Sequence, residues 1–222
     1  MDNGIHVSRN LSGIIKYKSA ATPLHIQPCD YRINRVLKRF TDIIFATFMI
    51  IFILSWLTPI LAVLIKLDSK GPVFFLQKRN KRNGKIFLCI KFRSMIVNQD
   101  ADLVPAAVND PRITRIGKFL RPTYLDEFPQ FLNVLWGDMS VVGPRPHMIS
   151  ENLRYDELVE HYDYRNKVKP GITGLAQVMG YVGSTGNIRE MQDRVNMDIF
   201  YVRHWSLKLD ISILYNTIRK AT

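Results

Sequence analysis

The sequence predicts a helix-dominated α+β fold, held as a monotopic membrane protein by one re-entrant, broken helix near its N-terminus. Residues 43–65 contain no charged side chain, which predicts a membrane helix. Two short β-type runs at 71–76 and 85–92 predict a hairpin, and later segments alternate apolar with basic residues, which is typical of interfacial amphipathic helices. A chain of 222 residues is long enough for one domain with a substantial core.

The charge balance predicts an anionic partner. Thirty-one Lys and Arg against nineteen Asp and Glu leave a net charge of +12, which suits nucleic acid, anionic lipid or nucleotide substrates. Cys29 and Cys89 are the only cysteines, and their wide separation excludes a disulfide framework and a cysteine metal site. The scattered histidines argue against a histidine metal site.

Residues 1–34 form an extension of unknown role, since they show no sustained periodicity. The apolar run that follows would be about 35 Å long as a helix, enough for a bilayer core of roughly 30 Å. It starts too late for a secretory signal peptide and no cleavage-type site follows it, so we expect it to be retained.

Basic residues flank this run on both sides, which favours placing both of its ends on the cytoplasmic face. They are Arg32, Arg35, Lys38 and Arg39 before it, and Lys66, Lys70, Lys78, Arg79, Lys81 and Arg82 after it. Thr58 and Pro59 supply a helix break inside the run, because proline lacks a backbone donor. We therefore favour a re-entrant helix, with an ordinary spanning helix and a tolerated proline kink as the alternative.

The remaining elements follow in order. The strands at 71–76 and 85–92 are joined by a basic turn at 80–84, and residues 111–121 form a short helix that lies either in the headgroup layer or on the core. Residues 151–167 are expected to form a surface helix. Glycine-rich turns at 171–177 and 180–187 precede two closing helices at 188–204 and 206–219, with Ser206 as a cap.

Asp126 and Glu127 are adjacent within a cationic stretch, and Pro129 places them at the start of a helix. Neighbouring helix positions point about 100° apart, so one carboxylate could attack phosphorus or bind a metal while the other orients the metal or relays a proton. Oxygen ligands of this kind suit Mg2+. Arg121 and Arg145 are candidates for phosphate contacts.

A structural alternative stays open, in which the acid pair caps the helix behind Thr123 and complements the helix dipole. Asp138 is either a metal ligand or a turn residue after Gly137, and the turn is favoured.

Several motifs in order resemble the bacterial sugar transferases, the monotopic polyprenyl-phosphate phosphoglycosyl transferases. They occupy residues 91–95, 125–130, 133–140, 142–146 and 169–174, within a resemblance that spans about 36–220. The resemblance implies transfer of a sugar-1-phosphate from a UDP-sugar to undecaprenyl phosphate, with release of UMP, as the first membrane step of polysaccharide or glycoconjugate assembly.

By the same resemblance, Asp126 would be the covalent nucleophile, Glu127 would lie beside it, and both would bind the required Mg2+. The residues that would bind substrate or phosphate are Lys91, Arg93, Arg112, Arg121, Arg145, Thr173 and Gln177. The family breaks its membrane helix at a Ser-Pro pair, which here would be Thr58 and Pro59. Phe128 and Asn80 replace the more usual Leu and Gly.

Together these observations divide the chain into an extension at 1–34, a re-entrant helix at 35–68 and a cytosolic catalytic domain at 69–222, and the resemblance implies the cytoplasmic face of a bacterial inner membrane. Residues 201–210 resemble the ending of larger glucose- or galactose-phosphate transferases, which tilts the sugar toward a hexose. N-acetylated sugars and the oligomeric state stay open. Two rivals remain: a non-catalytic basic module that binds anionic lipid, and a membrane nucleotide-sugar hydrolase. Nucleic acid is not expected, since regularly spaced base-stacking aromatic pairs are absent from the sequence.

Overall fold

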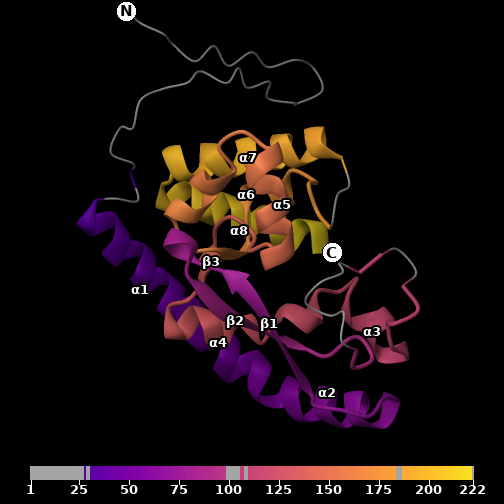
Figure 1. Ribbon diagram of the computed structural model, residues 1–222. Coiled ribbons are helices and arrows are strands. Elements are labelled where there is room, and N and C mark those ends of the chain that lie inside the picture. Colours follow the sequence, from indigo (N-terminus) through magenta and orange to yellow (C-terminus); the bar gives the residue numbers. More distant parts are fainter. Residues whose placement is uncertain (1–27, 29–30, 99–105, 108–109, 184–186, 222) are drawn as a thin grey trace, which may run out of the picture.

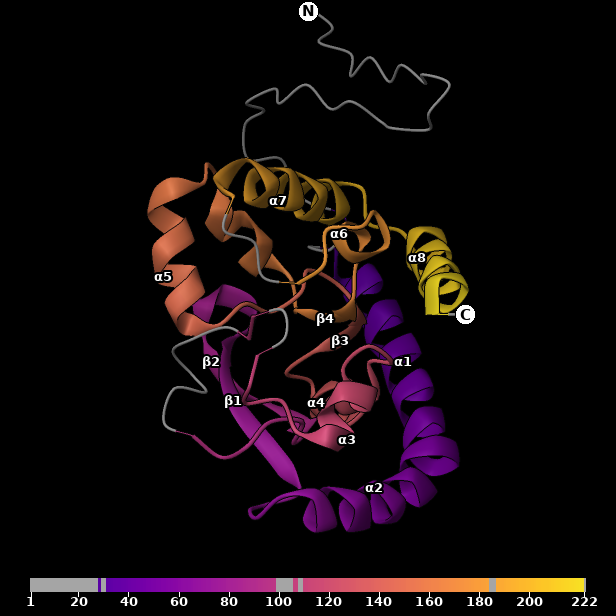
Figure 2. The same ribbon diagram turned by 90° about the vertical axis from the view of Figure 1, so that its right-hand side faces the viewer.

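A long, bent N-terminal helical segment runs along one side of the fold (Figures 1 and 2). The computed structural model describes residues 28, 31–98, 106–107, 110–183 and 187–221. Helix α1 (Arg32–Met49) continues through a π-helical turn (Ile50–Leu54) into α2 (Ser55–Asp68), which leaves α1 in a clearly different direction. The expected break in this helix is confirmed.

Pro59 explains the bend, although the backbone widens one turn before the proline itself. Proline cannot donate to the carbonyl four residues earlier, that of Ser55, and its ring clashes with that carbonyl. The wide π turn ends at Leu54, directly before Ser55, whose hydroxyl donates to the Ile51 carbonyl at 2.5 Å. The distortion therefore lies at 50–54 and not at Thr58.

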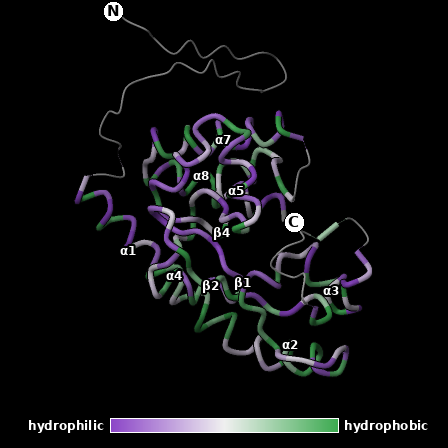
Figure 3. Tube along the Cα trace, viewed as in Figure 1, coloured by the Kyte–Doolittle hydropathy of each residue, from purple (hydrophilic) through white to green (hydrophobic). Residues whose placement is uncertain are grey.

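The outer face of this segment is apolar and exposed. It is long and apolar enough to cross a membrane over Arg32–Asp68, and only 22% of its most apolar window is buried, in keeping with the hydrophobic run along α2 (Figure 3). Large exposed side chains on it include Phe40, Ile44, Phe48, Phe52, Trp56, Val63 and Leu67. A surface of this kind indicates membrane association.

Two of the basic residues before the apolar run bind groups of later helices, which the flanking-charge argument did not predict. Lys38 forms an ion pair with Asp210 at 2.7 Å. Arg39 donates to the carbonyls of Val134 and Leu135, at 2.5 and 2.6 Å, and so satisfies the last turn of a later helix.

The predicted hairpin is present as β1 (Phe74–Asn80) and β2 (Ile86–Phe92), paired antiparallel with Gln77 opposite Cys89. The first strand begins three residues later than expected and extends into the predicted turn. On the other edge of β2, Asn133 of α4 (Gln130–Trp136) donates to the Leu88 carbonyl at 2.8 Å and accepts from the Ile90 amide at 3.0 Å. One amide side chain thus joins the hairpin to α4.

A second, parallel pair of strands was not expected: β3 (Ser140–Val142) with β4 (Gly171–Thr173). Glycine allows the close approach, because a Cβ on Gly171 would lie 2.1 Å from the backbone nitrogen of Gly143. Asp42 of α1 accepts hydrogen bonds from Ser140 and Val141, both at 2.9 Å, which fixes this pair against the long helix.

The C-terminal helices cover the end of the fold opposite α2 (Figure 1). The single helix expected at 151–167 is wrong: α5 ends at Leu158, Val159 is extended, His161 adopts a left-handed φ of 57°, and a 3-10 helix follows. Ser206 accepts from the Leu209 amide at 3.2 Å, as expected of a cap. The elements are α5 (Ile149–Leu158), the 3-10 helix (Tyr162–Lys167), α6 (Leu175–Val178), α7 (Ile188–Arg203) and α8 (Leu207–Ala221).

The short helix α3 (Arg115–Leu120) packs near the end of α2 and is shorter than the 111–121 expected. Thr114 caps it by accepting from the Gly117 amide at 3.0 Å, and Asp68 accepts from the Ile116 amide at 2.9 Å. Leu120 belongs to the same apolar cluster as the inner face of α2. The segment that carries the acid pair begins directly after α3, so the packing of α3 on α2 fixes where that segment starts.

Candidate active site

Asp126 and Glu127 lie on a one-turn 3-10 helix (Leu125–Glu127) that precedes α4. Their position near a helix start agrees with the sequence, but they occupy a separate turn, since α4 begins at Gln130. Capping by Thr123 is wrong, because its hydroxyl donates to the Phe119 carbonyl at 2.8 Å. Both acids are buried, 7% and 6% exposed.

Glu127 is held by two cations. Its Oε1 lies 2.7 Å from Nζ of Lys91 on β2, and Arg145 donates to both of its oxygens, with Nη1 2.8 Å from Oε2 and Nη2 bonded to Oε1. Burial opposes ionisation, but Arg145 and Lys91 prevail and hold the pKa of Glu127 well below its usual range. Glu127 in turn raises the pKa of Arg145. This carboxylate is therefore ionised and immobilised.

Asp126 is different. Within the part of the chain that the structure describes, its carboxylate has no hydrogen-bond or ion-pair partner. Burial raises the pKa of Asp126 to about 6; Lys91 and two arginines oppose this shift, and Glu127 adds to it. The two neighbouring acids thus differ: Glu127 is paired and ionised, whereas Asp126 has no partner among the described residues and has a raised pKa.

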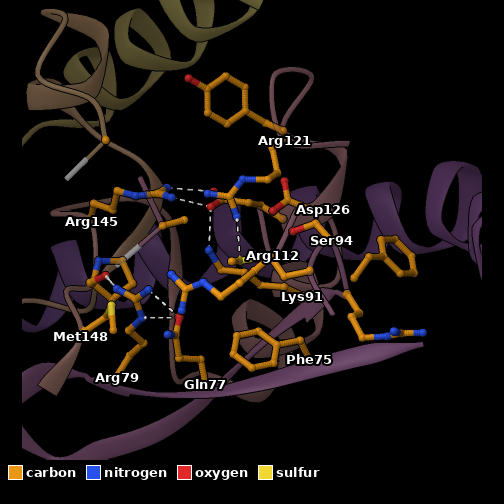
Figure 4. A pocket seen from close by; sticks show the side chains of 18 of the residues that line it. Phe75, Gln77, Arg79, Lys91, Ser94, Arg112, Arg121, Asp126, Arg145 and Met148 are labelled. Carbon is orange, nitrogen blue, oxygen red and sulfur yellow. Dashed lines mark hydrogen bonds and ion pairs between the residues drawn. The ribbon is translucent and has the colours of Figure 1, made fainter. Parts of the chain in front are cut away.

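Both acids line a cavity of about 480 Å³ with many basic side chains in its wall. Six of the seven residues assigned to substrate or phosphate line it and come from several elements: Lys91, Arg93, Arg112, Arg121, Arg145 and Gln177. Figure 4 shows Arg121, Arg112, Lys91 and Arg145 gathered around Asp126. Their summed charge suits a diphosphate.

These side chains are not equally available. Arg112 is engaged by Asp110, with Nη2 2.7 Å from Oδ2. The one hydrogen bond of the Arg121 guanidinium among the described residues is a long one, 3.7 Å from Nη1 to Sδ of Met95. Arg121 is therefore the cation in this wall best placed to take a new anionic partner.

The polar atoms of Arg93 and Thr173 are already bonded to other protein groups. Arg93 also borders the cavity, but its guanidinium donates to the carbonyls of Pro72 and Ser69, at 2.6 and 2.8 Å, and so ties the hairpin to the end of α2. The hydroxyl of Thr173 lies 2.7 Å from that of Thr217 on α8, and Thr173 is not among the described residues that line the cavity.

Asp138 follows Gly137, which has a left-handed φ of 93°, and it pairs with Lys81 at 2.5 Å. It is a turn residue, as favoured from the sequence, and no described part of the cavity wall includes it.

A buried polar cluster behind Arg145 was missed by the sequence reasoning. It comprises His147, Tyr162, Arg165 and Asp198, from a loop, a 3-10 helix and α7. Arg79 on β1 was assigned only to the membrane flank, yet it lines the cavity and donates to the Pro146 carbonyl at 2.8 Å. No local pattern links these residues, because tertiary packing alone brings them together.

The described residues contain no group of three or more His, Cys, Asp or Glu side chains that could hold a metal ion. Mg2+ commonly takes only one or two protein carboxylates, together with water and substrate phosphate oxygens. Asp126 offers a free carboxylate of this kind, whereas both oxygens of Glu127 are engaged by cations. The residues present therefore fit Mg2+, which Asp126 would hold and which would supply positive charge for phosphate chemistry.

A buried acid pair in a cationic cavity beside a bent apolar helix defines a membrane-associated protein suited to phosphate chemistry. Residues 33–222 match the family model described as bacterial sugar transferase, and the chain belongs to that family.

Three relatives illustrate this membership. The chain is 48% identical over 189 residues to the UDP-glucose:undecaprenyl-phosphate glucose-1-phosphate transferase of Klebsiella pneumoniae, covering 85% of this chain and 40% of that protein. It is 45% identical to the exopolysaccharide production protein PSS of Rhizobium leguminosarum bv. phaseoli, covering 82% of this chain and 94% of that protein. It is 42% identical to the UDP-N-acetylgalactosamine-undecaprenyl-phosphate N-acetylgalactosaminephosphotransferase of Aeromonas hydrophila, covering 82% of this chain and 43% of that protein. The chain thus spans about two fifths of the Klebsiella and Aeromonas relatives.

Proposed function

We propose that the protein transfers a sugar-1-phosphate from a UDP-sugar to undecaprenyl phosphate, releasing UMP and starting the assembly of a polysaccharide or glycoconjugate. The observation that carries this proposal is the free, buried carboxylate of Asp126 within a wall of basic side chains. The names of the relatives support the same reaction class, with glucose in one and N-acetylgalactosamine in another.

In the proposed first step, an Asp126 oxygen attacks the phosphorus that carries the sugar. The bond from that phosphorus to the bridging oxygen of the diphosphate breaks, and UMP leaves with the electron pair. In the second step, a phosphate oxygen of undecaprenyl phosphate attacks the same phosphorus. The aspartyl bond breaks, the carboxylate returns, and undecaprenyl diphosphate sugar is formed.

The positive charge of the cavity wall explains how the Asp126 carboxylate can approach the negatively charged diphosphate of the donor. Glu127 keeps the guanidinium of Arg145 and the ammonium of Lys91 beside Asp126, so that positive charge is present before substrate arrives. Arg121, Arg112 and Gln177 line the remaining wall toward the diphosphate and its substituents. Mg2+, held by Asp126 and phosphate oxygens, would neutralise charge on the diphosphate. We assign Arg93 and Thr173 to packing, because other protein groups occupy their polar atoms.

For the membrane part, we propose that residues 35–68 form a re-entrant helix and that 69–222 form the catalytic domain on the cytoplasmic face, with 1–34 as a preceding extension. The bend at 50–54 supports this arrangement, because it turns the apolar segment partway along its length. Basic residues at both ends favour the same side. Amphipathic helices such as α3, with Phe119 exposed, would rest in the headgroup layer.

Single cysteines test this topology. With Cys29 and Cys89 replaced by Ser, Arg32→Cys and Lys70→Cys would be treated with a membrane-impermeant maleimide in spheroplasts. A re-entrant helix predicts that both sites are labelled only after the membrane is permeabilised. Labelling of one site in intact spheroplasts would instead establish a spanning helix.

The activity is tested by incubating the purified protein in detergent with a panel of UDP-sugars, Mg2+ and undecaprenyl phosphate, following UMP. Release that depends on the lipid and is lost in Asp126→Asn, but kept in the control Asp138→Asn, is the expected result. Release without lipid acceptor would point to a nucleotide-sugar hydrolase. No release with any donor would support the non-catalytic lipid-binding module.

A further inference from the structure

The loop that carries Arg145 is held by side chains outside the catalytic cavity. Arg165, 4% exposed on the 3-10 helix Tyr162–Lys167, donates from Nη2 to the carbonyl of Arg145 at 2.6 Å. Its Nη1 lies 2.7 and 2.9 Å from the two ring nitrogens of His147. From β1, Arg79 donates to the carbonyl of Pro146 at 2.8 Å. Three consecutive residues, 145–147, are thus fixed by two arginines.

We propose that Arg165 is a positioning residue for the reaction: it sets the backbone of Arg145 and thereby the place of the Arg145 guanidinium on Glu127, beside Asp126. This inference rests on the proposed function. Arg165 acts indirectly, since the described residues that line the catalytic cavity include Arg145 and His147 but not Arg165.

Arg165 is itself immobilised. Its Nη2 lies 2.9 Å from Oδ2 of Asp198 on α7, a carboxylate that is 2% exposed, and its guanidinium stands 5.4 Å from the ring centroid of Tyr162. The Tyr162 hydroxyl lies 2.6 Å from Nδ1 of His147 and donates to Asn152 at 2.8 Å. A buried guanidinium with this many partners has one available orientation.

His147 takes part as a neutral ring. Burial, reinforced by Arg165 and other nearby arginines, lowers the pKa of His147 well below its ordinary value. A neutral imidazole can accept a hydrogen bond from Arg165, whereas an imidazolium would repel it. The hydrogen bond from Arg165 to His147 is therefore kept across the neutral pH range.

Arg165 would affect the reaction through the position of the Arg145 guanidinium. Arg145 meets Glu127 with two parallel N–H groups, and such a fork tolerates little rotation or displacement of the arginine backbone. A displacement of about 1 Å at a reacting centre can cost roughly 100-fold in rate. Lysine at 165 keeps the positive charge for Asp198 but cannot bridge the Arg145 carbonyl and the His147 ring at once.

The test is a double-mutant cycle of Arg165→Lys and Arg145→Lys, measured as UMP release per folded protein with the donor that the wild type uses. We expect Arg165→Lys to lower turnover by roughly 10- to 100-fold. In the Arg145→Lys background the same change should cost less than about threefold, because the group it positions has already been altered. Multiplicative effects of the two changes would overturn the proposal.

Arg39→Lys is the matched control. It also removes hydrogen bonds from a guanidinium to the backbone, here to the carbonyls of Val134 and Leu135, at the far end of α4 from the acid pair. The turnover of Arg39→Lys should stay within about twofold of wild type if the position of Arg145, and not the general stability of the fold, sets the rate. A loss equal to that of Arg165→Lys would mean that the effect is only structural.

Amide hydrogen exchange supplies a readout independent of activity. A peptide spanning 145–149 should exchange faster in Arg165→Lys than in wild type, while peptides from α1 keep their rates. Unchanged exchange at 145–149 overturns the positioning role. Absence of UMP release by wild type overturns the proposed function instead, and the exchange result still reports on the loop.

Discussion

Replacing Asp126 with Asn is expected to stabilise the fold while it abolishes transfer. The wild-type carboxylate is buried, and ionisation there is unfavourable because it has no partner among the described residues. Moving its pKa from 3.8 to about 6 corresponds to roughly 3 kcal/mol at pH 7, at about 1.4 kcal/mol per pH unit. Asn has nearly the same shape and no charge. The gain in stability should therefore approach this figure as an upper bound.

The gain has a defined pH dependence. The folded-state pKa of Asp126 is raised, so the folded protein binds the proton more tightly than the unfolded chain, and wild-type stability falls as pH rises between about 3.8 and 6. The advantage of Asp126→Asn is complete above about pH 6 and shrinks as the pH falls toward 3.8. For a chain of this size, about 3 kcal/mol corresponds to roughly 6 to 12 °C in apparent melting temperature.

The assay is thermal unfolding of purified protein in detergent with EDTA and without substrate, at pH values from 4.5 to 8, since a bound ligand would itself stabilise the fold. Glu127→Gln should melt lower than wild type, because it leaves the charges of Lys91 and Arg145 without their carboxylate, a loss of about 3 to 5 kcal/mol for a buried pair. Asp138→Asn, at a partly exposed ion pair, should change stability by about 1 kcal/mol or less. A lower melting temperature for Asp126→Asn at pH 7.5, or an equal gain at pH 4.5, would refute the reasoning.

Three further outcomes are expected. UMP release, measured as kcat/KM, should fall as the pH drops below about 6, since the reactive form of Asp126 is the carboxylate; a flat profile from pH 5 to 8 would contradict this. Pro59→Ala should straighten the membrane helix, which spin labels at residues 36 and 67 would report as a distance rising toward about 46 Å, whereas an unchanged distance would show that proline does not cause the bend. Gly171→Ala should destabilise the fold by at least about 2 kcal/mol in chemical unfolding, because its Cβ would lie 2.1 Å from the Gly143 nitrogen; wild-type stability would disprove the close approach.

Local patterns were sufficient for most of the secondary structure. The apolar run at 43–65, the hairpin and the two closing helices follow from periodicity and breakers that act over a few residues, and the structure contains each of them. The helix predicted at 151–167 is wrong because His161 adopts a left-handed φ and ends the helical path. No glycine or proline in this stretch signals the turn. The β3 and β4 pair joins residues 31 positions apart, and each strand has only three residues, too few for a strand pattern.

The sequence by itself singled out the acid pair as the candidate site, since Asp126 and Glu127 are neighbours and the motifs around them carry the family resemblance. Only the tertiary structure decided which acid is free, because this depends on Lys91 from β2 and Arg145 from a distant loop reaching one carboxylate and not the other. It also decided that Arg93 and Thr173 are engaged elsewhere and that Arg165 lies behind Arg145. Electrostatic and hydrogen-bond partners are set by distance in space, and for residues far apart in the chain the sequence does not give that distance.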